Sequence, residues 1–326
     1  MREQMISRAC ELLANGSVDR VIGWERGEFV YDVTPAVFND AEDLKNRFVF
    51  DLFCGANLSK YLVSETAKGG KVLAFLKPCD TYSFNQLLAE HRVKRENVYI
   101  IGVECNGMAD INRIREAGAS GIKSISSAGG KVTVSTVYGD REFTLSDVIE
   151  ERCSSCKSRH HVVYDELMGK DGEVLDSNRF DMVEKLEKMT PDERFEFWRG
   201  ELSRCIRCNA CRNVCPACTC EKCIFDNASS GFENKAAADT FEENMFHIIR
   251  AFHVAGRCTD CGECSRVCPA HIPLHLLNRK FIKDINELYG EYQAGEEEGS
   301  RSPLVSYTTE DLDPTDALAR EGKNNV

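Results

Sequence analysis

The chain has 326 residues, of which 42% are hydrophobic and 29% charged, so it is long enough to form two modest domains with a buried core. Its formal net charge of -12 argues against nucleic acid as a partner, because phosphate binding requires a basic face. The first ten residues lack the apolar core of a signal peptide, and no apolar run reaches the length of a membrane span. We therefore expect a cytoplasmic chain, in which the 17 cysteines are reduced and available to metal rather than paired in disulfides.

The N-terminal part of the chain alternates strand-like and helix-like patterns. Apolar runs predict three strands, at residues 48–53, 71–76 and 97–103. Amphipathic spacing predicts two helices between them, at 57–67 and 81–91. Two further strands, at 131–138 and 142–145, are expected to form a hairpin around Gly139 and Asp140. Continuous apolar strands between helices are typical of a sheet covered on both faces, so we predict an α/β domain over residues 1–150.

From about Ser146 the pattern becomes mainly helical. Three helices are predicted, at 146–152, 181–189 and 191–204, and the last has Thr190 as its N-cap and Pro191 in its first turn. The expected order is a helical connector over 151–200, a cysteine-rich helical domain over 201–290 and an acidic tail over 291–326. For the tail we favour a solvated, partly disordered end over a strap across a partner subunit.

Two cysteine runs share the spacing of bacterial ferredoxins, in which three cysteines two residues apart precede a fourth that is followed by proline. In this spacing the fourth cysteine ligates the cluster of the other run. We therefore predict one 4Fe–4S cluster on Cys205, Cys208, Cys211 and Cys268. The second cluster is predicted on Cys258, Cys261, Cys264 and Cys215. A single run would also suit zinc, but two runs that both end in Cys-Pro favour clusters.

Three more thiols follow the first run, at Cys218, Cys220 and Cys223. Two interpretations are open at this point. The thiols are ligands of a further cluster or of a zinc ion, or they are unliganded and packed beside the first cluster.

A looser group of cysteines lies upstream. Cys54, Cys79 and Cys105 follow the three apolar runs, and the carboxyl ends of parallel strands meet at one edge of a sheet. The pair Cys153 and Cys156 would complete the group. We favour an additional 4Fe–4S cluster at the sheet edge over isolated buried cysteines, which are common in protein cores.

Several segments resemble the beta subunits of formate dehydrogenases and of deazaflavin (coenzyme F-420)-reducing hydrogenases. Residues 77–80 (Lys-Pro-Cys-Asp) and 97–107 are similar to the α/β core of that family, and residues 205–216 and 255–264 to its ferredoxin module. The resemblance implies an α/β sheet domain followed by a mainly helical, bacterial-ferredoxin-like domain with two clusters.

For function, the resemblance implies an electron-transfer subunit of an anaerobic redox complex. Its partners would be a formate dehydrogenase or hydrogenase-type catalytic subunit and a flavin-containing, heterodisulfide-reductase-like protein. The alternative is a self-contained flavoprotein oxidoreductase that reduces deazaflavin or NAD(P). The residues themselves suggest no catalytic acid, base or nucleophile.

The same family implies a bound flavin, FAD, in many members, although the sequence has no nucleotide-binding fingerprint. If flavin binds, we expect it at the ligand edge of the sheet, near Asn57, Lys77, Cys79 and Asn106. Positive charge beside the clusters is expected to tune their potentials, from Arg204, Arg207, Arg212, Arg257 and Arg266.

Overall fold

The structure is a computed structural model that describes residues 1–227, 229 and 240–306. A five-stranded mixed sheet in the order β2-β1-β3-β4-β8 forms the N-terminal part. β1 and β2 are antiparallel, whereas β1, β3, β4 and β8 run parallel to one another. The strands are β1 (Arg20–Arg26), β2 (Val33–Phe38), β3 (Val72–Leu76), β4 (Val98–Val103) and β8 (Glu166–Met168). The predicted α/β sheet is thereby confirmed.

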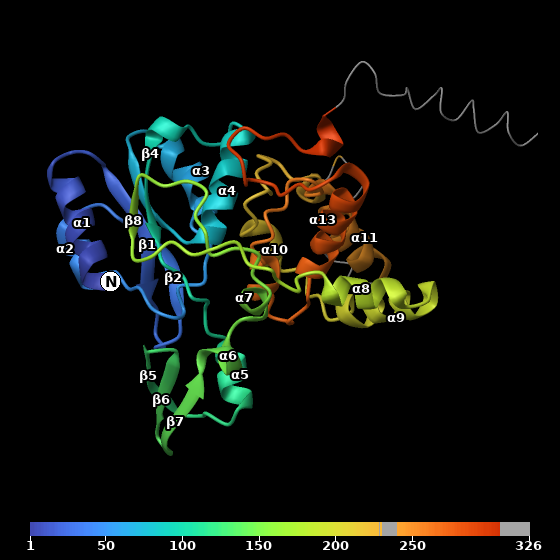
Figure 1. Ribbon diagram of the computed structural model, residues 1–326, viewed down its shortest axis with the longest axis horizontal. Helices are drawn as coiled ribbons and strands as arrows, with labels where there is room; N and C mark the ends of the chain where they lie inside the picture. Colours follow the sequence, from blue (N-terminus) through green and yellow to red (C-terminus); the bar gives the residue numbers. More distant parts are fainter. Residues whose placement is uncertain (228, 230–239, 307–326) are drawn as a thin grey trace, which may run out of the picture.

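Helices cover both faces of this sheet. Figure 1 shows α1 and α2 on one face and α3 and α4 on the other. Large apolar side chains fill the space between helices and sheet, among them Trp24, Phe38, Phe75 and Phe84. The helices are α1 (Arg2–Ala14), α2 (Ala41–Arg47), α3 (Ser59–Ala67) and α4 (Pro78–Ala89), followed by the 3-10 turn η1 (Arg95–Asn97).

The first strand lies earlier than the sequence predicts. The apolar run at 48–53 is not a strand, and Phe48 makes only an isolated bridge to Glu25. Its ring packs against β1, where a side-chain atom added at Gly23 would lie 2.6 Å from it. The run is therefore apolar because it covers a strand, and β1 itself is hard to detect because glycine and charged residues interrupt it.

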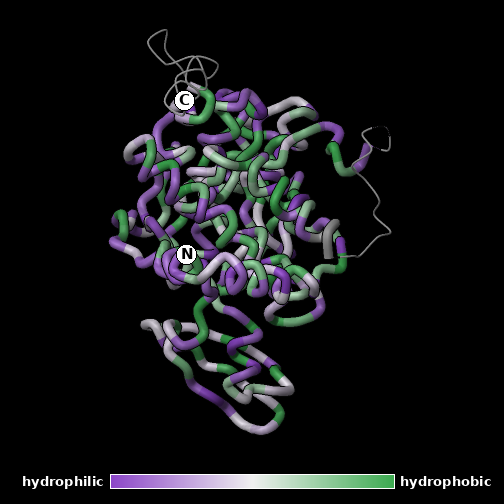
Figure 2. The backbone as a smooth tube through the Cα atoms, turned by 90° about the vertical axis from the view of Figure 1, so that its right-hand side faces the viewer, coloured by the Kyte–Doolittle hydropathy of each residue, from purple (hydrophilic) through white to green (hydrophobic). Residues whose placement is uncertain are grey.

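A separate lobe projects from the body of the molecule (Figures 1 and 2). Its antiparallel sheet consists of β5 (Ile122–Ala128), β6 (Lys131–Thr136) and β7 (Gly139–Thr144). The helices α5 (Ile111–Glu116) and α6 (Leu145–Val148) pack on it around Ile114, Val132 and Val148. The predicted hairpin is confirmed, although its turn lies at Val137 and Tyr138, two residues earlier than expected.

The remaining helices form the second half of the molecule (Figure 1). The predicted capping of α9 is confirmed, because Thr190 and Glu193 form a reciprocal capping box. The helix predicted at 146–152 is instead split into α6 and α7 by the extended residue Ile149. The helices are α7 (Glu151–Ser154), α8 (Asp181–Lys188), α9 (Pro191–Leu202), α10 (Ala210–Asn213), α11 (Thr240–His253), α12 (Glu263–Arg266) and α13 (His275–Tyr289).

Two short 3-10 turns complete this half, η2 (Ile224–Asp226) and η4 (Pro303–Val305). The connector expected to be helical also supplies β8, a strand of three residues that is too short to show a pattern.

The start of the acidic tail is packed rather than solvated. Ala294 is 2% exposed, and an added side-chain atom at Gly295 would lie 1.9 Å from the carbonyl oxygen of Tyr82 on α4. Residues 307–326 of the tail lie outside the described residues. Among the helices that the structure describes, none is long and apolar enough to cross a membrane.

Candidate iron–sulfur centres

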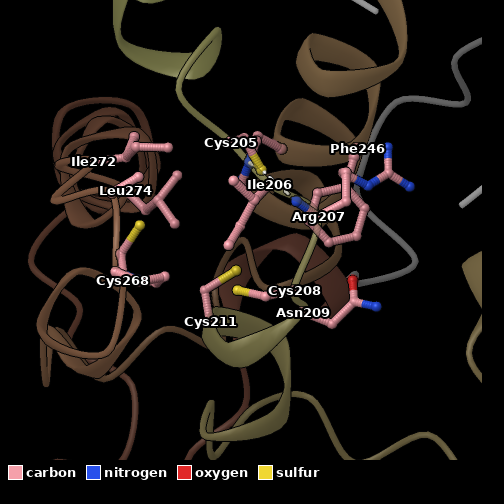
Figure 3. Close-up of a pocket in the computed structure, with 13 residues that line it drawn as sticks. Cys205, Ile206, Arg207, Cys208, Asn209, Cys211, Phe246, Cys268, Ile272 and Leu274 are labelled. Atoms are coloured by element: carbon pink, nitrogen blue, oxygen red, sulfur yellow. Dashed lines mark hydrogen bonds between the residues drawn. The ribbon is translucent and has the colours of Figure 1, made fainter. Parts of the chain in front are cut away.

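Four cysteines drawn from both ferredoxin-type runs line one cavity. Figure 3 shows the labelled sulfur atoms pointing into a shared space beside Ile272 and Leu274. Three of the cysteines belong to the first run and one to the second. We call them the first ferredoxin set: Cys205, Cys208, Cys211 and Cys268.

A second cavity repeats this arrangement with the roles of the runs exchanged. It is lined by the second ferredoxin set: Cys258, Cys261, Cys264 and Cys215. The structure thus brings the cysteines together in the interleaved grouping that the spacing predicts. All 17 cysteines are free thiols, so each set offers four sulfur donors around a cavity, which fits a 4Fe–4S cluster. Within the described residues, no three His, Cys, Asp or Glu side chains converge closely enough to hold a single metal ion.

The two runs reach this geometry with the same backbone. Residues on either side of the second cysteine of each run are left-handed, with φ of 54° and 60° at Arg207 and Asn209. The equivalent residues Asp260 and Gly262 have φ of 56° and 67°. A left-handed residue other than glycine costs about 1–2 kcal/mol. The repeated strain bends each run so that its first three cysteines face inward.

The loop after Cys215 is held against the α/β domain by its backbone. Three consecutive carbonyl oxygens there, at residues 217–219, accept hydrogen bonds from three cations. Arg257 donates to Ala217 at 2.9 Å, Arg92 donates to Thr219 at 2.7 Å, and Lys60 of α3 donates to the residue between them. The dicluster half is therefore docked on α3 and on the end of α4.

Cys79 and Cys105 meet at the carboxyl edge of the sheet. Leu76 of β3 pairs in register with Gly102 of β4, and each cysteine lies three residues beyond its member of that pair. Cys79 is in the first turn of α4, and Cys105 is in the loop that follows β4. Parallel neighbours thus place the two thiols side by side, as the pattern of the sequence predicts.

Cys153 of α7 and Cys156, two residues beyond the end of that helix, approach the same edge. Cys105 interacts electrostatically with Cys79, Cys153 and Cys156. Gly107 permits the approach, because a side chain there would lie 2.5 Å from Ile149 and 3.6 Å from the Cβ atom of Cys153. We call these four residues the sheet-edge set: Cys79, Cys105, Cys153 and Cys156.

The thiols of the sheet-edge set are partly buried. Burial raises the pKa of Cys153 to about 12, and it raises the pKa of Cys79 and of Cys105 above the ordinary thiol value. Such thiols keep their protons near neutral pH until a metal displaces them, so cluster binding would release protons.

Two partly buried cations connect the sheet-edge set to the second ferredoxin set. Arg152, next to Cys153, donates to the carbonyl oxygen of Cys261 at 3.0 Å and forms an ion pair of 2.5 Å with Glu263. Lys157, next to Cys156, donates to the carbonyl oxygen of Thr259. In the sequence each is a cation next to a cysteine, and no pattern there indicates a contact with the second run.

The remaining cysteines are placed elsewhere. Cys54 is fully buried in the core, where its Sγ accepts a hydrogen bond from the backbone N–H of Asp51 at 3.2 Å and donates to the carbonyl oxygen of Val49 at 3.7 Å. The expected strand before Cys54 does not exist, so this thiol is not delivered to the sheet edge as Cys79 and Cys105 are.

The three thiols after the first run are directed to different neighbours. Cys218 interacts with Cys215, Cys220 is exposed, and Cys223 interacts with Arg212. This arrangement favours the interpretation in which they are unliganded thiols beside a cluster. Cys10 of α1 was not assigned a role from the sequence, and its thiol donates to the carbonyl oxygen of Ala41 at 3.9 Å.

The residues suggested for flavin have structural contacts instead. Asn57, 1% exposed, donates to Ser83 at 2.9 Å, and Ser83 is hydrogen-bonded to Thr259 of the second run at 2.9 Å. Lys77, also 1% exposed, donates to Asp80 at 2.9 Å, and its ammonium group lies 4.6 Å from the ring centre of Trp24.

Asn106 lies on the exposed side of the loop after β4, where it donates to Glu104 at 3.2 Å. Asn57 and Lys77 are thus enclosed by protein, and Cys79 belongs to the sheet-edge set. Of the four residues suggested for flavin, Asn106 is the exposed one.

Four of the five arginines expected to tune the clusters have carboxylate partners. The ion pairs join Arg204 to Glu201, Arg212 to Asp226, Arg257 to Glu90 and Arg266 to Glu263. The fifth, Arg207, lies over the ring of Phe246 at 4.4 Å. A different arginine, Arg250 of α11, is buried next to both ferredoxin sets. The signal for it is a charged residue on the buried face of an amphipathic helix, in line with Phe246 and His247.

Comparison with known proteins agrees with this geometry. Residues 201–272 match the family described as "4Fe-4S dicluster domain". The chain is 23% identical over 337 residues to the "F420-dependent formate dehydrogenase subunit beta" of Methanocaldococcus jannaschii, with 86% of this chain and 88% of the relative covered. It is 24% identical over 274 residues to the "F420-dependent formate dehydrogenase 1 subunit beta" of Methanococcus maripaludis, with 65% and 70% covered.

Among solved structures, a chain of the F420-reducing [NiFe] hydrogenase complex from Methanosarcina barkeri is 15% identical. The match covers 57% of this chain and 76% of that chain. Its TM-score of 0.38 is too low to support an argument about fold.

The fold and the cysteine sets define an iron–sulfur protein with an α/β sheet domain and a 4Fe–4S dicluster domain. Its resemblance to the beta subunits of formate dehydrogenases, expected from the sequence, is confirmed. The chain is accordingly an electron-transfer subunit of the oxidoreductase class.

Proposed function

We propose that this chain relays electrons within a cytoplasmic, anaerobic redox complex. It would connect a formate dehydrogenase or hydrogenase-type catalytic subunit to a flavin-containing, heterodisulfide-reductase-like partner. The arrangement of three cysteine sets in succession is the observation that supports this proposal most strongly. The names of the relatives support a catalytic subunit that acts on formate.

In this proposal, each of the three sets holds one 4Fe–4S cluster through its four thiolates. A bound cluster of this type takes up and releases one electron at a time. The chain itself contributes the enclosure: the two ferredoxin cavities are lined by apolar residues as well as cysteines, such as Ile272 and Leu274 in the first and Ala217 in the second. Limited access of water is one of the factors that set cluster potentials.

The order of the sets follows from the cations between them. Arg152 and Lys157 join the sheet-edge set to the second ferredoxin set, and Arg250 lies between the second and the first. Cys208 of the first set is exposed, so this end of the series is open to a partner. We therefore assign the first ferredoxin set to the contact with one partner and the sheet-edge set to the contact with the other.

Flavin has no part in this assignment. Two of the residues suggested for it, Asn57 and Lys77, are enclosed by protein, so we route no step through a flavin in this chain and place that cofactor in the partner. The absorbance of the loaded chain tests this directly: we expect the broad iron–sulfur shoulder alone, and resolved flavin bands would favour the self-contained flavoprotein.

Anaerobic purification of the full chain from its own cells tests the proposal as a whole. We expect it to co-purify with a formate dehydrogenase or hydrogenase-type subunit, and we expect formate or hydrogen to bleach its iron–sulfur absorbance only when that subunit is present. Turnover of deazaflavin or NAD(P) by the isolated chain would instead support an independent enzyme.

A further inference from the structure

Arg250 is a buried cation of α11 that lies near cysteine side chains of both ferredoxin sets. The side chain is 4% exposed, and its Nε and one terminal nitrogen have no hydrogen-bond partner in the described structure. Most arginines beside the two cysteine runs have a carboxylate partner instead. Arg212 and Arg266, for example, form ion pairs of 2.7 Å with carboxylates.

The position of α11 explains which groups Arg250 meets. One turn earlier on this helix, Phe246 and His247 line the first cavity, and the His247 Nε2 atom lies 3.2 Å from the Sγ atom of Cys205. Arg250 lies one turn further along the same buried face of α11.

The groups that act on Arg250 are cysteines of both ferredoxin sets. They are Cys211 of the first set, Cys264 and Cys215 of the second, and the neighbouring Cys218. Burial opposes the charge on Arg250, but a guanidinium is not deprotonated in proteins, so this buried side chain stays a cation.

A guanidinium in this position requires negative charge close by. Burying an unpaired ion is strongly unfavourable, and among the described residues no ion pair satisfies Arg250 as Asp226 satisfies Arg212. Thiolate-ligated clusters are anionic and would supply that charge from both sides. Reduction adds one negative charge to a cluster, so a cation in fixed contact with it favours the reduced form.

We propose that Arg250 is the counter-ion shared by the two clusters of the dicluster domain and that it raises the reduction potentials of both. This inference rests on the proposed function, because it requires both ferredoxin sets to hold clusters. Arg250 would thus be a positioning residue outside the cysteine motifs that raises the reduction potentials of two neighbouring clusters together.

A redox titration of the loaded full-length chain, followed by EPR, tests the role of Arg250. We expect Arg250→Met to shift the reduction equilibrium of both clusters at least tenfold toward the oxidised form, which is about 59 mV per cluster for a one-electron couple. Arg250→Lys, which keeps the charge, should retain most of the wild-type potentials. Arg199→Met is the matched control: this arginine is exposed on α9, pairs with Glu196, and should leave both potentials unchanged.

The outcomes separate this inference from the proposed function. Unchanged reduction potentials in a fully loaded Arg250→Met variant would overturn the inference and leave the proposed function intact. A shift in the potential of only one of the two clusters would do the same. A further outcome is that Arg250→Met fails to retain its clusters. In that case, restored cluster loading and potentials in Arg250→Lys would support the counter-ion role of Arg250. If both variants fail to retain clusters, Arg250 serves packing, and the counter-ion role is overturned. A wild-type chain without reducible clusters overturns the proposed function and this inference together.

Discussion

Cys79 and Cys105 lie at equivalent positions beyond the ends of two parallel strands, each three residues after the paired residues Leu76 and Gly102. Strand pairing thus fixes two thiols of the sheet-edge set before any metal binds. α7 and the residues just after it add the other two thiols, and Gly107 leaves room for the approach of Cys153.

A cluster on the sheet-edge set predicts that Cys105→Ser removes about four iron atoms of a total of about twelve per chain. Cys105 is chosen because it interacts with the other three cysteines of the set. Iron analysis after anaerobic reconstitution measures the effect. Cys54→Ser is the control and should keep the full iron content, since the Cys54 thiol is buried in the core. About eight iron atoms per wild-type chain would refute the additional cluster.

The interleaved grouping makes a prediction about Cys215. Cys215→Ser should impair the cluster built mainly from the second run, because Cys215 lines that cavity with Cys258, Cys261 and Cys264. EPR of the reduced variant distinguishes the two signals. Cys218→Ser, three residues away, should leave both signals in place. Selective loss of the cluster held by Cys205, Cys208 and Cys211 would contradict the grouping.

Arg152 joins the two halves of the molecule and its removal should destabilise them. The side chain contacts Glu263, the carbonyl oxygen of Cys261 and, at 2.8 Å, the carbonyl oxygen of Gly55. Breaking a buried ion pair from one side costs about 3–5 kcal/mol. Arg152→Met should therefore lower the free energy of unfolding of the loaded chain by that order in denaturant titration.

The exposed ion pair of Arg199 with Glu196 provides the comparison for Arg152. Its loss in Arg199→Met should change stability by no more than about 1 kcal/mol. Equal losses in the free energy of unfolding in the two variants would show that Arg152 contributes no more to stability than an exposed charge does.

The contact between Glu166 and Arg8 predicts how the stability of the protein depends on pH. A hydrogen bond from Arg8, with Nε 2.9 Å from Oε2, lowers the pKa of Glu166, which links β8 to α1. A lowered carboxyl pKa gives stability that is complete above the unfolded value of about 4.3 and is lost as pH falls through the folded value. The stability deficit of Glu166→Gln should therefore be constant between about pH 6 and pH 8 in thermal unfolding. A deficit that shrinks as pH falls across this window would contradict the lowered pKa.

The sequence predicts the two ferredoxin sets well because their chemistry is local. Three ligands of each set lie within seven residues, and only the exchange of Cys215 and Cys268 requires long-range structure. The sheet-edge set depends on strand register, and here the prediction follows the true strands for Cys79 and Cys105. It includes Cys54 because the apolar run before it has the pattern of a strand, whereas Phe48 of that run covers β1.

The cations between the sets are harder to predict from the sequence. Arg152 and Lys157 acquire their role only when the dicluster half docks on the α/β domain. The sequence favours the arginines in and beside the two runs as the charges that tune the cluster potentials. In the structure, carboxylates form ion pairs with most of them. Arg250 lies far from the runs in sequence and close to them in space, because α11 returns beside the first cavity.

Reductive titration of the loaded full-length chain tests the account most directly. The number of electrons taken up per chain, with iron content measured on the same sample, reports every redox-active set at once. The account predicts one electron for each of the three cysteine sets, returned without loss of iron on reoxidation. A chain that binds iron but takes up no electrons at accessible potentials would contradict its role as an electron-transfer subunit.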